Sequence, residues 1–393
     1  MKGGAKLHNI DLQLTINDLK REFEIYKTKK QNVYGNFVSP VGGDYMNICD
    51  VESKQDAIFS SLLLQYSNGS LEFNDYYVKE KYINNRKRTL YIPSISKAVF
   101  QKALIRKLND PILKYPICSL MSKKYSSQNI VCEMSESLSN NKWFVHLDIK
   151  SCMESIDRYK LKNIVLQHYT NNVGALFFKY IDNVSNYLCE ERGLFTGDPF
   201  SSALQNLYLT SYDSYILNCI CQLPVLYYRY VDDIFFISND ISIINKLEFL
   251  SISFFNDTLG MELKLKKRYD IEETPYIDFY YFRFNRYGVQ LRKKLISWYH
   301  QQLNEIIDRS DSLIDAISLV NKYILKERND YVKFNPDSML SFFIRTAPHS
   351  QRVQMDKWIA RKLRNKFYKT CECSEMNTLI NRNLLKISHF SHT

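Results

Sequence analysis

Apolar residues that run together or alternate with polar ones predict several β-strands in the middle of the chain. Residues 143–149 (WFVHLDI) have the continuous apolar pattern of a buried strand. Residues 225–238 suit the strands of a hairpin or one central strand, and residues 276–284 with 288–292 suit a further hairpin. Residues 81–92 place a basic turn before a β-rich run and predict one more hairpin. Hairpins of this kind build antiparallel sheets.

Apolar positions at helical spacing predict helices around these strands. One helix is expected to begin with Ser96 as its N-cap, and another to cover residues 155–169. A third should begin near Ser201, after the glycine-punctuated turn GLFTGDP, and residues 244–261 should form a fourth. Helices and strands therefore alternate through the first two thirds of the chain.

The C-terminal part is predicted to be helical only, from about residue 296. Its strongest helix is expected over residues 355–369 (MDKWIARKLRNKFYK). Basic residues surround an apolar row made of Ile359, Leu363 and Phe367. A mixed region, a strand-rich centre and a helical tail together indicate an α+β protein.

Composition adds a basic charge to this picture. Apolar residues make up 45% of the 393 residues, enough for a sizeable core, and the net charge is +11. A basic excess suggests a polyanionic partner, either nucleic acid or an anionic membrane surface. The 29 Tyr could stack on bases, or they could reflect a bias in composition.

Cysteine usage and hydropathy indicate the compartment and argue against zinc binding and membrane insertion. The nine Cys contain no CxxC pair, which argues against zinc and fits reduced thiols in a cytoplasmic protein. The first residues, MKGGAKLHNIDLQL, lack the apolar stretch of a signal peptide. No run of about 18 apolar residues occurs, so no membrane span is expected.

Three acidic residues have strand-forming neighbours. Asp148 ends the predicted strand at 143–149, and Asp232 and Asp233 lie inside RYVDDIFFIS. An Asp-Asp pair is commonly a solvated surface turn, but the aromatic and β-branched residues on both sides favour strands. Three carboxylates on neighbouring strands would suit two Mg²⁺ ions, about 4 Å apart, that assist an in-line phosphoryl transfer.

Three segments in order resemble the catalytic motifs of reverse transcriptases. Residues 146–157 (HLDIKSCMESID) resemble motif A, residues 193–209 (GLFTGDPFSSALQNLYL) motif B, and residues 229–238 (RYVDDIFFIS) motif C. Residues 87–104 (KRTLYIPSISKAVFQKAL) are similar to the fingers of bacterial enzymes related to group II introns and retrons. Residues 256–267 (NDTLGMELKLKK) resemble motif D.

The resemblance continues to about residue 370 and implies a right-hand polymerase. Residues 277–284 (IDFYYFRF) resemble the primer-grip motif E, with Tyr in place of its usual glycine, and the helix at 355–369 resembles a basic thumb helix. The implied division is an N-terminal extension without a match (1–80), fingers (81–147), a palm whose antiparallel sheet carries the acids (148–285), and a helical thumb and tail (286–393).

The resemblance also implies roles for single residues. Asp148, Asp232 and Asp233 would be catalytic ligands of two Mg²⁺ ions, for which Mn²⁺ could substitute, and Ile149 would supply a backbone position. Nucleotide-binding roles fall on Lys81, Arg88, Met153, Thr196, Gly197, Asp198 and Lys267. Primer or nucleic-acid contacts fall on Tyr230, Tyr281, Arg361 and Arg364. Tyr230 could equally be a core residue, and Lys267 a solvated one.

Three positions depart from the family pattern. Met153 stands where Phe or Tyr usually excludes the ribose 2′-hydroxyl, so Met153→Ala should incorporate ribonucleotides more readily. Thr196 replaces a common glutamine, and Asp198 replaces a small residue. An acid that faced phosphates or a template base would be unfavourable unless it bound a metal, another cation or a base amine, which argues against ordinary processive copying.

These departures leave three hypotheses open. The first is an RNA-directed DNA polymerase of the stand-alone, phage-defence class, with dNTPs, an RNA template (in some relatives a dedicated non-coding RNA) and a DNA product. The second is a template-independent or protein-primed DNA polymerase in the same setting. The third is a relic palm that serves as an RNA-binding scaffold, against which the three intact acids argue.

Overall fold

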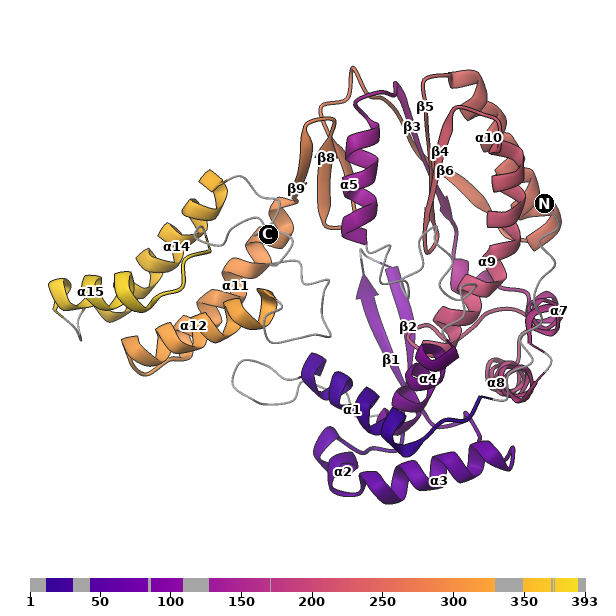
Figure 1. Cartoon of the computed structure of the whole chain (residues 1–393), viewed down its shortest axis with the longest axis horizontal. Helices are drawn as coiled ribbons and strands as arrows, with labels where there is room; N and C mark the ends of the chain where they lie inside the picture. Colours follow the sequence, from indigo (N-terminus) through magenta and orange to yellow (C-terminus); the bar gives the residue numbers. More distant parts are fainter. Residues whose placement is uncertain are drawn as a thin grey trace. The chain divides into compact units, whose positions relative to one another are not determined.

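The computed structural model forms two compact units. The first unit contains helices α1 to α4 and all elements from β3 to β6, and the second contains α5 and all elements from β7 onward (Figure 1). The residues that the structure describes are 12–30, 43–83, 86–108, 127–169, 171–328, 349–368, 370 and 372–387.

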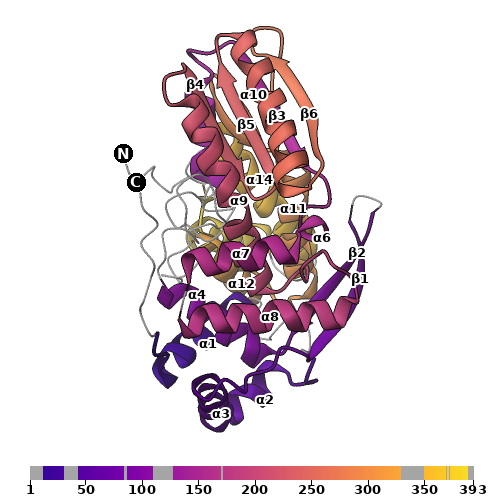
Figure 2. The ribbon, with the colours of Figure 1, turned by 90° about the vertical axis from the view of Figure 1, so that its right-hand side faces the viewer.

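A four-stranded antiparallel sheet lies at the centre of the first unit. Its order is β4 (Val225–Tyr230), β5 (Asp233–Ser238), β3 (Trp143–Ile149) and β6 (Leu263–Asp270). Helix α10 (Ile241–Ser253) packs across β3, β5 and β6 (Figure 2). The predicted strand at 143–149 and the predicted hairpin at 225–238 are therefore confirmed.

Strand β6 has no counterpart among the predicted strands. Five successive positions of β6, from Lys264 to Arg268, are exposed, as suits an edge strand whose lysines discourage pairing with another chain. A row of lysines gives a weak strand pattern, which explains why the sequence indicated only a motif there.

Helix α9 (Pro199–Ile220) is buried on nearly all sides and packs against α4 and α7 (Arg158–His168). It begins two residues earlier than predicted because the side chain of Asp198 caps it. One carboxylate oxygen of Asp198 accepts hydrogen bonds from the backbone N–H groups of Phe200 (2.8 Å) and Ser201 (3.2 Å). Proline at the first helical position suits this start.

The N-terminal helices belong to the core of the first unit. Helices α1 (Ile16–Lys30) and α3 (Gln55–Ser67) pack against each other and against α4 (Ile95–Leu108), and α2 (Ile48–Ser53) joins them. One hydrophobic cluster runs from Leu12 through these helices to β6. The segment without a sequence match is thus built into the same body as the central sheet.

Helix α4 starts at a different cap from the one expected. Ser94, not Ser96, takes the N-cap position, because its hydroxyl accepts from the N–H of Lys97 (3.3 Å) and its carbonyl from Ala98 (2.9 Å). Ser96 lies inside the helix and is buried.

The remaining elements of the first unit are a hairpin and two further helices. Strands β1 (Tyr76–Ile83) and β2 (Arg86–Pro93) confirm the hairpin predicted over 81–92 and extend it. Helices α6 (Cys152–Ser155) and α8 (Asn172–Leu188) lie on either side of α7 along the chain.

The second unit combines a small sheet with helices. Strands β7 (Ile277–Phe279), β8 (Phe282–Asn285) and β9 (Gly288–Leu291) form a three-stranded antiparallel sheet. The segment 276–284, expected as one strand, breaks at Tyr280, whose φ of 56° allows a tight turn. Helix α5 (Ser127–Ser137) joins this sheet through a hydrogen bond from the Ser135 hydroxyl to the carbonyl of Asn285.

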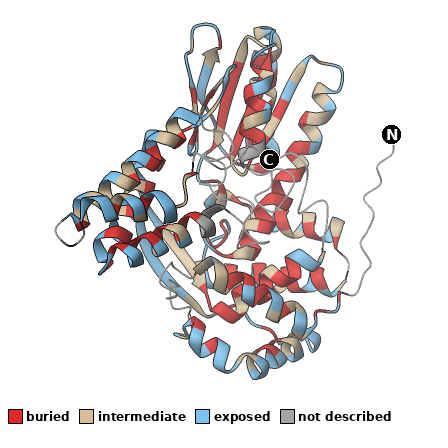
Figure 3. Ribbon diagram, turned by 60° about the vertical axis from the view of Figure 1, so that its left-hand side comes forward, coloured by how far each residue is buried: buried red, intermediate tan, exposed pale blue. Residues whose placement is uncertain are grey.

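The C-terminal part is helical, as predicted. Among the described residues its helices are α11 (Lys293–Arg309), α12 (Leu313–Arg328), α14 (His349–Phe367) and α15 (Cys373–Asn383). The predicted apolar row of Ile359, Leu363 and Phe367 is buried, and Figure 3 shows buried stripes opposite exposed ones on such helices. Together with the antiparallel sheets, these helices confirm the α+β class. Among the described helices, none has the length and apolar character needed to cross a membrane.

Candidate active site

The three predicted acids lie together at one end of the central sheet. Asp148, near the end of β3, pairs directly with Asp233, the first residue of β5. Asp232 lies in the turn between β4 and β5, and its carbonyl accepts a hydrogen bond from the N–H of Ile149 (3.1 Å). The adjacent acids thus occupy the tip of a hairpin, where a strand end and a turn meet, and not the middle of a strand.

Lys266 places a positive charge between two of the acids. Its Nζ lies 3.2 Å from Oδ1 of Asp148 and 3.1 Å from Oδ1 of Asp233. The pairing of β3 with β6 shifts by one residue between His146 and Leu147, so Lys266 is the extra residue of a β-bulge. A bulge redirects a side chain, and here it accompanies a lysine directed at the carboxylates.

The electrostatics of the acids reflect their crowding. Burial, followed by the negative charges of Asp233 and Asp148, raises the pKa of Asp232 to about 6, and Lys266 only partly opposes this. Burial would lower the pKa of Lys266, but the charges of Asp233 and Asp148 prevail and raise it. The carboxylates therefore form a site that favours an added cation.

The donor set fits a hard divalent cation. In the part of the chain that the structure describes, no three His, Cys, Asp or Glu side chains are arranged to hold one ion as they stand. Instead, the ammonium group of Lys266 lies between two carboxylate oxygens. Oxygen ligands of this kind suit Mg²⁺, which needs few carboxylates when substrate phosphates complete its shell.

His146 is a further polar group at the acids. It is two residues before Asp148 on β3 and so faces the same side of the sheet. Its Nε2 is hydrogen bonded to Oδ1 of Asp233, and both side chains are buried. Asp233 is therefore held by two nitrogen groups, from β3 and from β6.

The turn before α9 approaches the β1–β2 hairpin. The carbonyl of Thr196 accepts a hydrogen bond from the N–H of Tyr91 (2.9 Å). Gly197 has a φ of 101°, which favours glycine, and a Cβ there would lie 3.4 Å from the carbonyl oxygen of Tyr91. Thr196 is half-buried and Gly197 exposed, so this turn remains a candidate for nucleotide contact.

Asp198 is not in a position to face a nucleotide. It has no exposed surface, and besides capping α9 it accepts hydrogen bonds from the Tyr76 hydroxyl and from Nε2 of Gln101, both at 3.0 Å. Burial raises the pKa of its carboxyl. The nucleotide-binding role expected for Asp198 is wrong, because the helix start needs its side chain inside the protein.

The basic nucleotide candidates fall at two places. Lys81 and Arg88 are direct cross-strand partners in the β1–β2 hairpin, and both are exposed. Lys267 pairs with His146 in the sheet, but its Nζ lies over the ring of Tyr269, 5.7 Å from the centroid. The lysine of β6 that contacts the acids is thus Lys266, the neighbour of Lys267, for which the resemblance implied a nucleotide-binding role.

Several other candidates are packed into the first unit. Tyr230, opposite Asp233 in the sheet, is only 5% exposed, as its alternative core role requires. The side chain of Ile149 is in the core, while its N–H anchors Asp232. Met153 on α6 is half-buried against the same core.

The nucleic-acid candidates of the C-terminal part belong to the second unit. Tyr281 is 46% exposed in the turn between β7 and β8, and Arg361 is exposed on α14. Arg364 donates from Nε to Oδ1 of Asn377 on α15 (2.7 Å). Lys366 donates to carbonyls at the end of α11, namely those of Ile307, Asp308 and Ser310. Of the two predicted arginines, Arg361 is thus the more exposed and Arg364 the one already bound within the unit.

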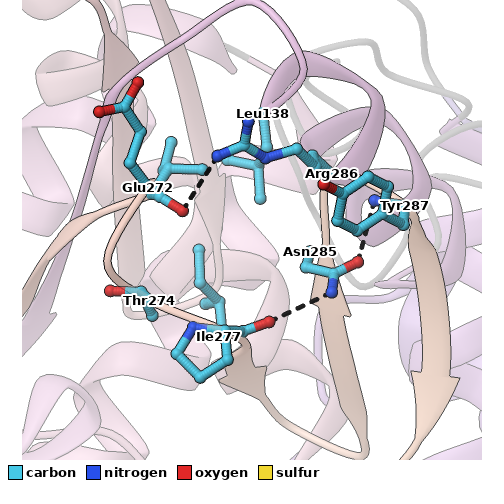
Figure 4. Close-up of a pocket in the computed structure, with 9 residues that line it drawn as sticks. Leu138, Glu272, Thr274, Ile277, Asn285, Arg286 and Tyr287 are labelled. Carbon is cyan, nitrogen blue, oxygen red and sulfur yellow. Dashed lines mark hydrogen bonds between the residues drawn. The ribbon is translucent and has the colours of Figure 1, made fainter.

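A small pocket of about 130 Å³ also lies in the second unit, beside β7 and β8 (Figure 4). Two of its polar side chains bind backbone: Asn285 donates to the carbonyl of Pro275 (3.1 Å), and Arg286 to that of Ile271 (3.4 Å). The pocket contains none of the predicted site residues.

Lys266, His146 and Arg229 contact the acids or their turn but were not among the predicted site residues. A signal existed for two of them: His146 interrupts an apolar strand at the spacing of Asp148, and Arg229 is a charge inside an apolar run. For Lys266 there was none, because a bulge leaves no mark in a run of lysines.

Comparisons with known proteins identify a family. The model of the family described as reverse transcriptase (RNA-dependent DNA polymerase) matches residues 78–276, slightly more than half of the 393 residues. No curated protein matches the chain at a significant level.

Two solved structures of telomerase are similar to this chain. Telomerase from Candida albicans in complex with a TWJ fragment of telomeric RNA is 12% identical, over 86% of this chain and 69% of that one, with a TM-score of 0.38. Apo telomerase from Candida tropicalis is 14% identical, over 80% of this chain and 68% of that one, with a TM-score of 0.44.

Proposed function

Since the chain belongs to the reverse transcriptase family of RNA-directed DNA polymerases, we propose that it joins dNTPs to a primer by nucleotidyl transfer at Asp148, Asp232 and Asp233. The observation that carries this proposal is that the three carboxylates meet at the tip of the β4–β5 hairpin, with the ammonium group of Lys266 between those of Asp148 and Asp233. Two Mg²⁺ ions, bound by these acids, would activate the primer 3′-hydroxyl and neutralise the triphosphate.

The surrounding residues have separate tasks in this proposal. Arg88 and Lys81, side by side on the hairpin, would hold the triphosphate, for which a guanidinium group is suited by its paired donors. The exposed Gly197 would let the nucleotide or a template base approach the backbone. Lys266 would move from the acids towards the phosphates as the substrate enters.

Copying of an RNA template is favoured over template-independent synthesis. The sequence argument against ordinary copying was the acid at position 198, placed against a template base or phosphate. Asp198 is buried and caps α9, so that argument no longer applies. The exposed Arg361 on α14 is available to follow a nucleic-acid backbone.

Primer extension tests the proposal. Purified full-length protein is incubated with Mg²⁺, dNTPs and a primer annealed to RNA of known sequence, and the product is sequenced. DNA complementary to the RNA is expected, and synthesis should stop after RNase treatment of the template. RNase-insensitive product of unrelated sequence would support the template-independent alternative instead.

We further propose a role in phage defence, supported by the sequence resemblance to bacterial enzymes and by the absence of the retron signatures N-A-x-x-H and V-T-G. A bacterial host that carries the gene is challenged with a panel of phages. Protection that is lost in Asp232→Asn/Asp233→Asn is expected. Protection that survives this double substitution would favour the scaffold hypothesis.

A further inference from the structure

The turn that carries Asp232 has an unfavourable backbone. Val231 has a φ of 58°, in the left-handed region, which a β-branched residue rarely adopts. The same turn holds Asp232 beside two other negative charges, those of Asp233 and Asp148. Backbone strain and charge repulsion therefore both disfavour the conformation that brings the acids together, so contacts from the surrounding structure must stabilise it.

The buried side chain of Arg229 stabilises this turn through a hydrogen bond. Arg229, 1% exposed at the end of β4, donates from one terminal nitrogen to the carbonyl of Val231 (3.1 Å). Its other terminal nitrogen donates to Oδ1 of Asn206 (3.0 Å) and to Asp213, and Nε donates to Oδ1 of Asp213 (2.8 Å). The next carbonyl, that of Asp232, accepts from Ile149. Two successive carbonyls of the turn are thus fixed.

The anchor for this arginine is the interior of α9. Asn206 and Asp213 are seven residues apart and so lie on one face, two turns along the helix. Asp213 has no exposed surface, and it also accepts from the Tyr227 hydroxyl (2.6 Å). A fully desolvated ion pair is a weak source of stability, because burial of both charges is costly. Its directionality, however, can fix a geometry.

We propose that Arg229, anchored by Asp213 and Asn206 of α9, is a positioning residue that sets the β4–β5 turn so that Asp232 and Asp233 meet Asp148 in a metal-binding arrangement. Arg229 does not touch the reacting groups; it acts through the carbonyl of Val231. The inference rests on the proposed metal site and adds the link between α9 and the turn.

Arg229→Lys tests this role in the full-length protein. A lysine keeps the charge opposite Asp213 but cannot donate to Val231, Asn206 and Asp213 together. We expect Mn²⁺ binding, followed by electron paramagnetic resonance, to weaken by about 10- to 100-fold. DNA synthesis should recover when the metal concentration is raised. A folded Arg229→Lys protein with wild-type Mn²⁺ affinity would overturn the proposal.

Arg106→Lys is the matched control for loss of an arginine fork. Arg106 of α4 donates through two nitrogens to the buried Glu22 of α1, in the same unit but on other elements. The Arg106→Lys variant should have a lower melting temperature and an unchanged Mn²⁺ affinity. An equal loss of Mn²⁺ affinity in Arg106→Lys would show that general destabilisation suffices, and would also overturn the proposal.

Two further variants complete the test. If Arg229→Lys does not fold, Asn206→Ala takes its place, since this variant removes one hydrogen-bond acceptor of the guanidinium group and leaves the ion pair with Asp213. Asn206→Ala should also weaken Mn²⁺ binding. Wild-type Mn²⁺ affinity in Asn206→Ala would contradict the proposal. Asp232→Asn/Asp233→Asn separates the two claims. If this double variant binds Mn²⁺ normally, the metal site itself is wrong; if it loses binding while Arg229→Lys keeps it, only the positioning role is wrong.

Discussion

Lys266 and a metal ion would compete for the same carboxylate oxygens. The ammonium group lies within 3.2 Å of both Asp148 and Asp233, and it relieves their repulsion when no metal is bound. Lys266→Met removes the competitor. We expect Mn²⁺ to bind more tightly, on the order of tenfold, which corresponds to about 1.4 kcal/mol. Titration of the variant by electron paramagnetic resonance measures this.

Lys264→Met is the control for that prediction. Lys264 is the cross-strand partner of Asp148, but its Nζ forms an ion pair with Glu262 (3.0 Å). Its loss should therefore change Mn²⁺ affinity much less than the loss of Lys266. Unchanged Mn²⁺ binding in Lys266→Met would show that the lysine does not compete with the metal, and weaker binding would show that it assists the site.

Asp198 gives a pH-dependent prediction that separates a structural acid from a catalytic one. Because burial raises the pKa of its carboxyl above the ordinary value, its contribution to stability is complete at low pH and is lost as the pH rises through the raised pKa. Asp198→Asn keeps an oxygen for the N–H groups of Phe200 and Ser201. Gln101 can turn its amide, since its Oε1 has no partner among the described residues.

The expected result follows from that sign. The free energy of unfolding of Asp198→Asn, measured with urea from pH 4 to pH 8, should rise relative to the wild type as the pH increases. Primer extension should be unaffected. A difference between the two proteins that does not vary with pH, or a loss of synthesis in the variant, would contradict the structural role.

Substitution of two basic residues of helix α14, Lys366 and Arg361, should have opposite effects on stability and on RNA binding. Lys366 caps the end of α11 through three backbone carbonyls, whereas Arg361 is exposed. Lys366→Met should lower the free energy of unfolding by about 1–2 kcal/mol and leave RNA affinity unchanged. Arg361→Ala should leave stability unchanged and reduce the slope of log affinity against log salt by about one.

Filter binding of RNA at several salt concentrations, with urea unfolding of the same samples, measures both effects. If Lys366→Met changes the salt slope and Arg361→Ala does not, the assignment of the two residues is reversed.

The elements that the sequence predicts well are those whose pattern is local. The strand at 143–149 and the hairpin at 225–238 stand in long apolar runs, and the apolar row of Ile359 and Leu363 has clear helical spacing. Strand β6 is not predicted because an edge strand buries little. The break at Tyr280 is not predicted because a tyrosine in a strand-like run gives no sign of a positive φ. Ser94 rather than Ser96 caps α4, a difference of two residues that helix propensity does not resolve.

The site shows the same division. The three acids follow from motifs in the sequence, and their meeting follows from strand pairing. The contacts of Lys266 depend on a bulge, and those of Arg229 on a helix anchored far along the chain, so neither can be derived from spacing. Asp198 was expected to bind the nucleotide because the sequence alone does not distinguish an acid that caps a helix from an acid that contacts a ligand.

At the scale of the whole molecule, the acids and the nucleotide candidates all belong to the first unit, and the exposed Arg361 belongs to the second. The N-terminal helices share a core with the central sheet, so they form part of the unit that contains the three acids. A net charge of +11 suits a protein that binds nucleic acid through its backbone phosphates.

If Asp148, Asp232 and Asp233 perform the nucleotidyl transfer, their loss must abolish incorporation of dNTPs. Incorporation of labelled dNTP on an RNA-templated primer, with Mg²⁺ in excess, is compared between the wild-type protein and folded Asp148→Asn and Asp232→Asn/Asp233→Asn variants. Both variants are expected to lose at least about a thousandfold in rate, since the loss of transition-state charge stabilisation is worth several kcal/mol. Incorporation by either variant at the wild-type rate would contradict the account.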